Sequence, residues 1–370
     1  MRVLHLIGSS GLYGAETVVT TLVRQLRAKG IDSCIGHIRY AGPDALKLEE
    51  HLSDCEVFPL LHRGRFDRRI LTQLRHEIQR RKIDVVHCHG YKPDLYGWIG
   101  ARFAHIPVIS TCHLWTRATR ALRLYAVIDG WILRHFDRVV GVSDPIVADL
   151  KSAGVEDQAL LCIPNGITMG SYATVLPAYR KLFPCDAHIF GAACRQVKAK
   201  GVDILLRAMA RVAPLVPRAR LLIAGSGPFI DEYRHLAREL EIADKVVFLG
   251  HVQSMPGFYA SLDTFVLSSL DEGLPMALLE AMASARVVIA TDVGSVKSLV
   301  RNEETGILIP PGNLTALTSA MLSVTSNYER LSHLGAAARW HVRVYYSDTR
   351  MTQRYADVYQ QMCNADRGPR

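Results

Sequence analysis

The sequence lacks the features that mark several common classes of protein. None of its eight cysteines belongs to a Cys-x-x-Cys motif, which argues against a structural zinc site or a thiol redox centre. Isolated cysteines in an enzyme-sized chain are typical of a reducing compartment, so we expect a cytoplasmic protein. No apolar run is long enough to cross a bilayer. The opening stretch MRVLHLIGSSG carries one basic residue and an apolar run that Gly8 interrupts, which predicts a buried strand instead of a signal peptide.

Low-complexity segments and short repeats are also missing. The sequence has no paired-aspartate metal motif, so we expect no metal site. The charge, in contrast, is uneven along the chain. The net charge is +9, and residues 1–185 hold 24 Lys and Arg against 17 Asp and Glu. A basic half indicates an anionic partner, which could be nucleic acid, phospholipid or a phosphate-bearing substrate. No RNA-binding motif or helix-turn-helix signature accompanies the charge, and this argues against nucleic acid.

The 370 residues suit two α/β domains, and two series of apolar strands alternate with helical patterns. Apolar strands that helices separate predict parallel sheets covered on both faces. We therefore predict an α/β fold of two facing Rossmann-like domains with a central cleft, 1–165 and 166–344. The expected strands are 2–7, 32–38, 55–58, 84–89, 107–111, 138–143 and 160–166, then 188–194, 220–228, 245–250, 263–269, 286–292 and 306–310.

Ligands of such folds bind at the carboxyl ends of the strands, so the loops that follow the strands carry the functional signal. The first loop, GSSGLYGAE (8–16), has glycines that allow backbone N–H groups to approach an anion. Its Gly-x-x-Gly-x-x-Gly spacing differs from the Gly-x-Gly-x-x-Gly of dinucleotide binders. A tight turn without a ligand is the alternative. Arg39, where such binders have an acidic residue, leaves an NADP-dependent oxidoreductase as a further alternative.

The second loop, CRQVKAKG (194–201), is bracketed by Arg195 and Lys200 at the entry of a helix. Two cations at a helix N-terminus oppose the helix dipole, which favours anions there. Their placement is favourable if a diphosphate supplies negative charge. A solvated loop is the alternative for this segment.

The third loop, DEGLPMALLE (271–280), joins a flexible Gly273 to a proline suited to the first helical position. The N–H groups of Met276, Ala277 and Leu278 are then expected to be free to hold a phosphate. Glu272 precedes the helix, and Glu280 lies where a carboxylate can accept two hydrogen bonds from a ribose diol. The alternatives are a helix-dipole interaction for Glu272 and an exposed helix position for Glu280.

With these loops in place, the chain resembles the retaining GT-B glycosyltransferases of family 4 over nearly its whole length. Glu-x7-Glu, from Glu272 to Glu280, is the most specific of the matching motifs. The other matching segments are YGAE (13–16), STCH (110–113), VSD (142–144), IPNG (163–166), RQVKAKG (195–201), AGSGP (224–228) and FLGHV (248–252).

The resemblance implies a role for each matching residue. Arg195 and Lys200 would grip the donor diphosphate, Glu272 would bind hydroxyls of the donor sugar, and Glu280 would bind the ribose. His113 would sit over the donor sugar. The remaining donor-binding residues would be Gly14, Gly227, Val252, Gly273, Leu274, Met276 and Ala277. As in similar enzymes, a final helix at about 345–363 would return to the first domain.

Two positions depart from the family pattern. Tyr13 replaces the first of two glycines that usually precede Ala-Glu, which would narrow the acceptor side of the loop. Ser298 stands where glutamate is common, and either donor choice or helix packing could depend on it.

The resemblance therefore implies transfer of a sugar from a nucleotide-diphosphate sugar, with retention, to a glycan or lipid-linked acceptor. Surface polysaccharide or glycolipid synthesis is the expected setting, and a sugar-nucleotide epimerase is the alternative on a similar fold. No cofactor or metal is expected, because the fixed cations Arg195 and Lys200 would take the place of a metal ion at the donor diphosphate. The basic segments 61–82 and 113–125 are candidates for binding the inner face of an anionic membrane, and solvated helices are their alternative.

Overall fold

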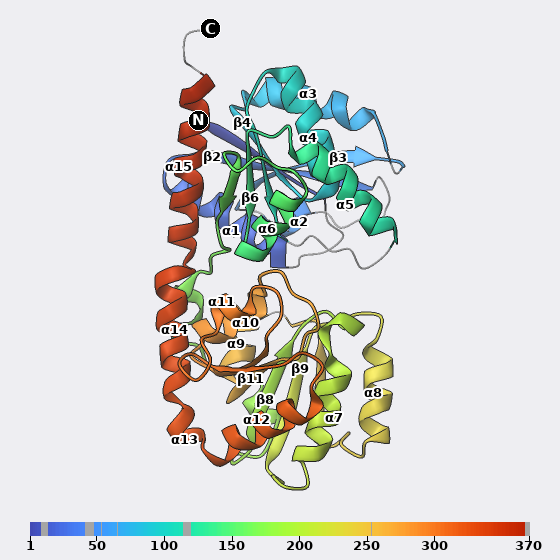
Figure 1. Ribbon diagram of the computed structural model, residues 1–370, viewed down its shortest axis with the longest axis vertical. Helices are drawn as coiled ribbons and strands as arrows, with labels where there is room; N and C mark the ends of the chain where they lie inside the picture. Colours follow the sequence, from blue (N-terminus) through green and yellow to red (C-terminus); the bar gives the residue numbers. More distant parts are fainter. Residues whose placement is uncertain are drawn as a thin grey trace. The chain divides into compact units, whose positions relative to one another are not determined.

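The computed structural model describes residues 1–8, 14–40, 48–52, 54–64, 66–113, 120–252 and 254–366 (Figure 1). The chain forms two compact units. Unit 1 comprises Met1–Gly166 together with Asp348–Arg370, and unit 2 comprises Ile167–Ser347. The division between the units thus falls next to the Asn165–Gly166 connection, and the C-terminal segment belongs to unit 1.

Unit 1 is built on a parallel sheet with the strand order β3-β2-β1-β4-β5-β6-β7. Its strands are β1 (Arg2–Ile7), β2 (Asp32–Tyr40), β3 (Glu56–His62), β4 (Val85–His89), β5 (Val108–Cys112), β6 (Arg138–Gly141) and β7 (Leu160–Cys162). Its helices are α1 (Gly14–Ala28), α2 (Leu48–His51), α3 (Arg69–Arg81), α4 (Tyr91–Ala104), α5 (Arg120–Leu133), α6 (Asp144–Ser152) and α15 (Asp348–Asp366).

Unit 2 is built on a second parallel sheet with the order β10-β9-β8-β11-β12-β13. Its strands are β8 (His188–Ala193), β9 (Ala219–Ala224), β10 (Val246–Gly250), β11 (Thr264–Leu267), β12 (Val287–Thr291) and β13 (Ile307–Ile309). Its α-helices are α7 (Val202–Val212), α8 (Ile230–Glu239), α9 (Met255–Ala260), α10 (Met276–Ala283), α11 (Val296–Leu299), α12 (Leu314–Ser326), α13 (Tyr328–Leu331) and α14 (His333–Tyr345), with 3-10 turns at Met169–Tyr172, Arg180–Leu182 and Lys198–Lys200.

Each strand predicted from the sequence is present, and the prediction of two parallel-sheet Rossmann-like domains is confirmed. Several strands end earlier than expected. The strand predicted over 220–228 ends at Ala224, because Gly225 adopts a positive φ and starts the loop. The apolar run sets the strand, and the glycine that follows ends it.

The helices form where the apolar spacing predicts them. In α7, Val202, Leu205, Leu206, Met209 and Val212 are all buried in the core of unit 2. Burial of each such side chain contributes roughly 1.5–3 kcal/mol, so this single face ties the helix to the sheet. The helix therefore holds its N-terminus, and the loop before it, in a fixed place relative to β8.

The strand orders define where ligands are expected. The first strand of each sheet, β1 in unit 1 and β8 in unit 2, has β2 or β9 on one side and β4 or β11 on the other. In unit 1 the chain continues from β1 toward one edge of the sheet and from β4 toward the other edge, and in unit 2 it does the same from β8 and β11. The loops that follow the two strands of each pair therefore diverge and leave a crevice. The functional residues of unit 1 should therefore follow β1 and β4, and those of unit 2 should follow β8 and β11.

The C-terminal helix α15 packs on unit 1, where it contacts α1. Its Tyr355 and Tyr359 are buried against the sheet. The hydroxyl of Tyr359 is 2.6 Å from His87 Nδ1, and that of Tyr355 is 2.9 Å from Thr111 Oγ1. The sequence expectation placed this helix at about 345–363, and it spans Asp348–Asp366.

The segment proposed for membrane binding at 61–82 contains α3. Its apolar side chains Ile70, Leu74 and Ile78 are buried within unit 1, so they are not available to lipid. Phe66, which precedes the helix, is 65% exposed. No helix within the described ranges is both long and apolar enough to cross a membrane.

Candidate active site

An ion pair joins the two loops at the crevice of unit 2. Lys200 lies in the loop after β8, and its Nζ donates to Oε1 of Glu272, which follows β11, at 2.6 Å. Ser269 Oγ donates to the same carboxylate oxygen at 2.7 Å. The Glu272 side chain is only 9% exposed. A nearly buried carboxylate requires such partners, so the predicted cation and the predicted sugar-binding carboxylate position each other.

Arg195 lies on the same loop as Lys200 but is exposed. Its guanidinium has no ion-pair partner in the part of the chain that the structure describes. The neighbouring Gln196 anchors the loop, because its N–H donates to Ser226 O at 2.9 Å and its carbonyl accepts from Phe229 N–H at 3.2 Å. Arg195 is thus a positive group on a fixed backbone, free to meet an anionic ligand.

The N-terminus of α10 differs from the sequence prediction in two details. Pro275 is the N-cap, with an extended conformation at ψ 108°, and not the first helical residue. Leu278 N–H is not free, because it donates to the Pro275 carbonyl at 3.1 Å. Both differences arise because α10 begins at Met276, one residue later than the sequence analysis predicted from the position of Pro275. Met276 and Ala277 remain as residues whose N–H groups can meet a phosphate. Gly273 and Leu274 are buried.

Close backbone packing fixes the position of this third loop. Gly294 has a φ of +53°, and a Cβ there would collide with the carbonyl oxygen of Glu272. The N–H of Ser295 donates to Gly273 O at 3.3 Å, and its hydroxyl donates to the same oxygen. Thr291 Oγ1 donates to Ser269 O at 2.6 Å. The end of β12 and the residues after it therefore hold the Ser269–Gly273 backbone in place.

Glu280 lies one helical turn inside α10 and is partly buried, so the alternative of an exposed helix position is wrong. Tyr259 OH donates to its Oε2 at 2.7 Å, and Tyr172 also hydrogen-bonds to the carboxyl group. Burial raises the pKa of Glu280 to about 7, against the opposing effect of the two tyrosine hydroxyls. The protein without ligand therefore holds this carboxyl group close to half-protonated at neutral pH.

Gly227 and Val252 follow the next two strands of the same sheet, β9 and β10. A Cβ at Gly227 would lie 2.5 Å from Gln196 O, so this loop packs directly on the loop of Arg195. Val252 is 8% exposed. Ser298, one of the departures from the family pattern, donates within its own helix to Ser295 O at 2.7 Å, and its carbonyl accepts from Tyr346 OH.

The remaining predicted residues belong to unit 1. Gly14 is the exposed first residue of α1. Tyr13 lies outside the described residues, as do Trp115 and the side chains of the arginines in 113–125. His113 directly follows β5 and lines a cavity of about 190 Å³. This cavity is also lined by Gly8, Glu16, His89, Asp94 and Asp129.

The cavity contains a pair of buried carboxyl groups that the sequence analysis missed. Asp94 of α4 and Asp129 of α5 hydrogen-bond to each other, and Ser110 Oγ donates to Asp94 Oδ1 at 2.6 Å. Burial, and next the Asp129 charge, raise the pKa of Asp94 well above its usual value. Asp94 therefore favours its protonated form more strongly than an exposed aspartate does. No sequence motif marks them, because the pairing depends on how α4 packs against α5.

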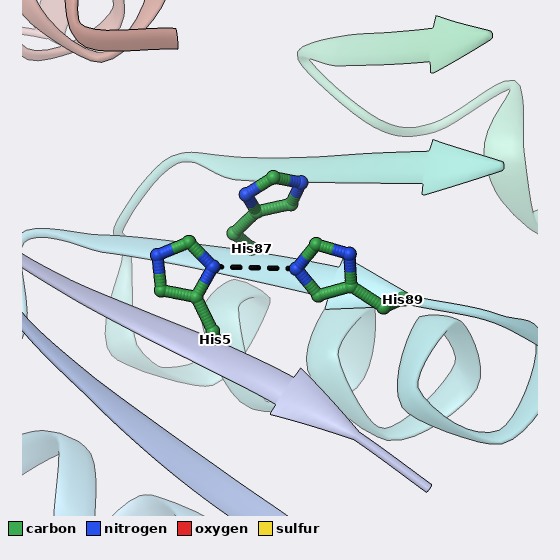
Figure 2. A group of neighbouring side chains, drawn as sticks. All are labelled: His5, His87 and His89. Atoms are coloured by element: carbon green, nitrogen blue, oxygen red, sulfur yellow. Dashed lines mark hydrogen bonds between the residues drawn. The ribbon is translucent and has the colours of Figure 1, made fainter. Parts of the chain in front are cut away.

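The sequence analysis also missed a cluster of histidines at the crevice of unit 1. His5 lies in β1, and His87 and His89 lie in β4, with their rings gathered on one face of the sheet (Figure 2). The signal was present, since alternate residues of Val-Val-His-Cys-His in a strand point to the same face. Burial lowers the pKa of His5 to about 3 and that of His113 to about 4, and it also lowers those of His87 and His89. All four rings are therefore neutral at pH 7.

Two family models of glycosyltransferases match this chain. The model of Glycosyltransferase Family 4 matches residues 13–170, and that of Glycosyl transferases group 1 matches residues 187–327. Phosphatidyl-myo-inositol mannosyltransferase of Mycobacterium leprae is 28% identical over 346 residues, which is 88% of each chain. The lipopolysaccharide core biosynthesis mannosyltransferase LpcC of Rhizobium leguminosarum bv. viciae is 27% identical over 280 residues, 73% of this chain and 76% of that protein.

Among solved structures, Anabaena HepE in complex with UDP and glucose superposes with a TM-score of 0.86 at 19% identity. The superposition covers 98% of this chain and all of that one, which shows a shared fold. The prediction of a glycosyltransferase is confirmed over its oxidoreductase and epimerase alternatives. The two family models together span most of the chain, and the chain belongs to the family 4 glycosyltransferases, group 1, with the GT-B fold.

Proposed function

We propose that the protein transfers a hexosyl group, with retention of anomeric configuration, from a nucleotide-diphosphate sugar to a glycan or lipid-linked acceptor. The observation that carries the proposal is the crevice of unit 2. There Lys200 and Glu272 are paired at 2.6 Å beside the N-terminus of α10. A cation, a carboxylate and the backbone N–H groups of a helix N-terminus therefore lie together where folds of this kind bind nucleotides, at the carboxyl ends of the strands.

On the donor side, the leaving diphosphate gains negative charge as the glycosidic bond breaks. Lys200, Arg195 and the N–H groups of Met276 and Ala277 would stabilise that charge. One such donor contributes about 3–4 kcal/mol in other enzymes. Glu272 would accept hydrogen bonds from sugar hydroxyls, and Glu280 would accept them from the ribose diol. Since no nucleophile is assigned among these residues, we propose front-face attack by the acceptor hydroxyl.

On the acceptor side, the cavity of unit 1 offers groups that suit a hydroxyl-rich molecule. Asp94 and Asp129 both line this cavity, and their carboxyl oxygens can accept hydrogen bonds from hydroxyl groups. His113, which we propose to contact the donor sugar, lines the same cavity. The relatives named above act on lipopolysaccharide and phosphatidyl-myo-inositol, and we propose an acceptor of this kind in surface polysaccharide or glycolipid synthesis.

The test is a screen of nucleotide sugars by thermal stabilisation, followed by analysis of the product. GDP-mannose, UDP-galactose and UDP-glucose are the first donors to try. Both curated relatives named above are mannosyltransferases, a UDP-Gal-dependent galactosyltransferase of Escherichia coli is 24% identical over 275 residues, and the superposed HepE structure holds UDP and glucose. One donor should raise the melting temperature, and NMR of its product should show the α or β configuration of that donor unchanged. Stabilisation by none of a full panel, or an inverted product, would contradict the proposal.

Because fixed cations occupy the diphosphate site, we propose that transfer needs no metal. The same assay run in EDTA should retain most of its rate. Complete loss of activity in EDTA, restored by magnesium, would contradict this part of the proposal.

A further inference from the structure

Unit 1 has a second cavity, of about 750 Å³, at the edge of its sheet where β5 and β6 begin. Val108, the first residue of β5, lines this amino-edge cavity, whereas Cys112, the last residue of β5, lines the cavity of His113. Four residue steps along a parallel strand span about 13 Å. The amino-edge cavity therefore lies across the sheet from the groups assigned to sugar transfer.

The amino-edge cavity carries positive charge that no acidic side chain neutralises. Arg102, in the last turn of α4, and Arg138, the first residue of β6, both line it. Neither forms an ion pair with a residue that the structure describes. Asp137 is the one acidic residue of the lining, and its Oδ2 accepts from the N–H of Val108 at 2.8 Å.

The helix dipole explains only one of the two arginines. A cation in the last turn of a helix interacts favourably with the dipole, so Arg102 has a structural role without any ligand. Arg138 begins a strand, where no such dipole exists, and its Nη1 donates to the backbone carbonyl of Asp137 at 2.7 Å. This hydrogen bond holds the guanidinium group of Arg138 at the cavity. An anionic ligand accounts for both arginines.

The apolar lining of the amino-edge cavity continues onto an exposed surface. Phe103 lines the cavity and is 68% exposed. α4 packs against α5 (Figure 1), and Trp131 of α5 is 53% exposed. The Trp131 ring centroid lies 6.0 Å from that of Trp98 and 4.8 Å from that of His135, both of which line the cavity. Val127, one helical turn before Trp131, is 71% exposed. Clustered apolar side chains of this kind mark an interaction surface.

The combination of charge and apolar surface selects the kind of ligand. A free phosphate ion would meet the arginines and leave the aromatic side chains in water. A second copy of this chain, related by a two-fold axis through the same face, would bring Arg102 and Arg138 against their own copies, and like charges repel. An anionic phospholipid uses both parts, because its phosphate suits guanidinium groups and its acyl chains cover apolar side chains.

We propose that the amino-edge cavity binds the headgroup of an anionic phospholipid, with Arg102 and Arg138 on the phosphate and with Phe103 and Trp131 against the acyl chains. The site anchors the protein and takes no part in transfer, because the candidate active site lies at the other edge of the sheet. The proposal does not rest on the proposed function, since neither a nucleotide nor a sugar enters it.

The test is calorimetric titration of the full-length protein with dihexanoyl-phosphatidylglycerol below its critical micelle concentration. A monomeric lipid can report on a cavity without a membrane surface. Dihexanoyl-phosphatidylcholine has the same acyl chains but no net charge, and inorganic phosphate has the charge but no acyl chains. We expect one-to-one binding of phosphatidylglycerol, with a Kd at least about tenfold lower than the Kd of either other ligand. No binding of phosphatidylglycerol, or an equal Kd for phosphatidylcholine or phosphate, would overturn the proposal.

The arginines are tested with a control of equal charge. Arg102→Ala with Arg138→Ala should raise the Kd of phosphatidylglycerol more than about tenfold, because charge-assisted hydrogen bonds to the phosphate are lost. Arg234→Ala with Arg238→Ala removes two arginines from a cavity of unit 2 and should leave the Kd unchanged. An equal loss in both variants would show non-specific attraction and overturn the proposal, as would an unchanged Kd in the folded first variant. If the first variant does not fold, Arg102→Ala alone, at an exposed position, repeats the comparison.

The apolar half of the site is tested separately. Phe103→Ser should raise the Kd of phosphatidylglycerol severalfold, whereas Leu215→Ser, which changes a 69% exposed leucine of unit 2, should not. Equal Kd values in the two variants would overturn the placement of the acyl chains. Sedimentation of the lipid-free protein as a dimer that Phe103→Ser dissociates would overturn the proposal in favour of a second copy of the chain.

Discussion

At the scale of single residues, neighbouring groups set the charge and the direction of each functional side chain. Glu272 and Lys200 form an ion pair at 2.6 Å, while burial raises the pKa of Glu280 to about 7. The sequence motifs were sufficient to predict that Lys200, Glu272 and Glu280 belong to the site, because residue type and spacing can be read from the sequence alone. It could not predict the pairing of Asp94 with Asp129 or the cluster of His5, His87 and His89, since those contacts depend on strand register and helix packing.

The pKa of Glu280 predicts how donor affinity depends on pH. Its ordinary value is 4.5 and burial raises it to about 7, so the free protein loses the stability gained from this proton as the pH rises through 7. The ribose diol requires the carboxylate, so the proton must leave when the donor binds. The donor Kd, measured by calorimetry, should be about tenfold weaker at pH 6 than at pH 8. Glu280→Gln should bind weakly at both values, and a wild-type Kd that is the same at both would contradict the role.

Removal of Arg195 and removal of Lys200 should affect kcat and the melting temperature differently. Arg195 is exposed without an ion-pair partner in the described chain, so Arg195→Ala should lower kcat roughly 100-fold with an unchanged melting temperature. Lys200→Ala should lower both quantities, because it leaves the nearly buried Glu272 carboxylate without its cation. Kinetics and thermal denaturation of both variants make the comparison. Near-normal turnover of Arg195→Ala would remove the argument for leaving-group stabilisation.

At the scale of elements, the loops after β8, β11 and β12 matter more than the strands themselves. The apolar runs predicted each strand to within a few residues, because burial on both faces needs continuous apolar sequence. The start of α10 was predicted one residue too early. Pro275 suits either the N-cap or the first turn, and only the packing of Gly273 against Ser295 decides between them.

A glycine substitution tests that packing. A Cβ at Gly294 would collide with the backbone of Glu272, so Gly294→Ala should displace the third loop and weaken donor binding more than tenfold. Gly30→Ala is the matched control, since Gly30 also has a positive φ of +79° but no atom within 4 Å of a Cβ. The control should lose about 1 kcal/mol of stability and keep its donor affinity. Equal donor affinities in the two variants would show that the close contact is unimportant.

At the scale of the whole molecule, the sequence predicted a two-domain enzyme, and the structure adds where its apolar surface lies. The basic segment 61–82 buries the apolar face of its helix. Three exposed apolar side chains lie on α4 and α5, where Phe103 is 68%, Val127 71% and Trp131 53% exposed. Val127 and Trp131 follow the basic segment 113–125 in the sequence, so we propose this surface, in place of the α3 face, for contact with an anionic membrane.

Flotation with vesicles tests this surface. The protein should float with vesicles that contain anionic phospholipid at low salt and should be released as salt rises, because the attraction is screened. Val127→Ser with Trp131→Ser should reduce the bound fraction severalfold. Ile70, Leu74 and Ile78 are unsuitable as controls because they form part of the core, so Leu215→Ser, exposed in unit 2, serves instead. No flotation at low salt would exclude the membrane proposal.

The central claim is that the donor diphosphate binds at the crevice between β8 and β11 in unit 2. The most direct measurement is a crystal structure of the protein with the nucleotide that stabilises it. We predict diphosphate oxygens within hydrogen-bond distance of Lys200 Nζ, the Arg195 guanidinium and the N–H groups of Met276 and Ala277, with the ribose diol on Glu280. A nucleotide bound elsewhere, with the Lys200–Glu272 crevice empty, would contradict the account.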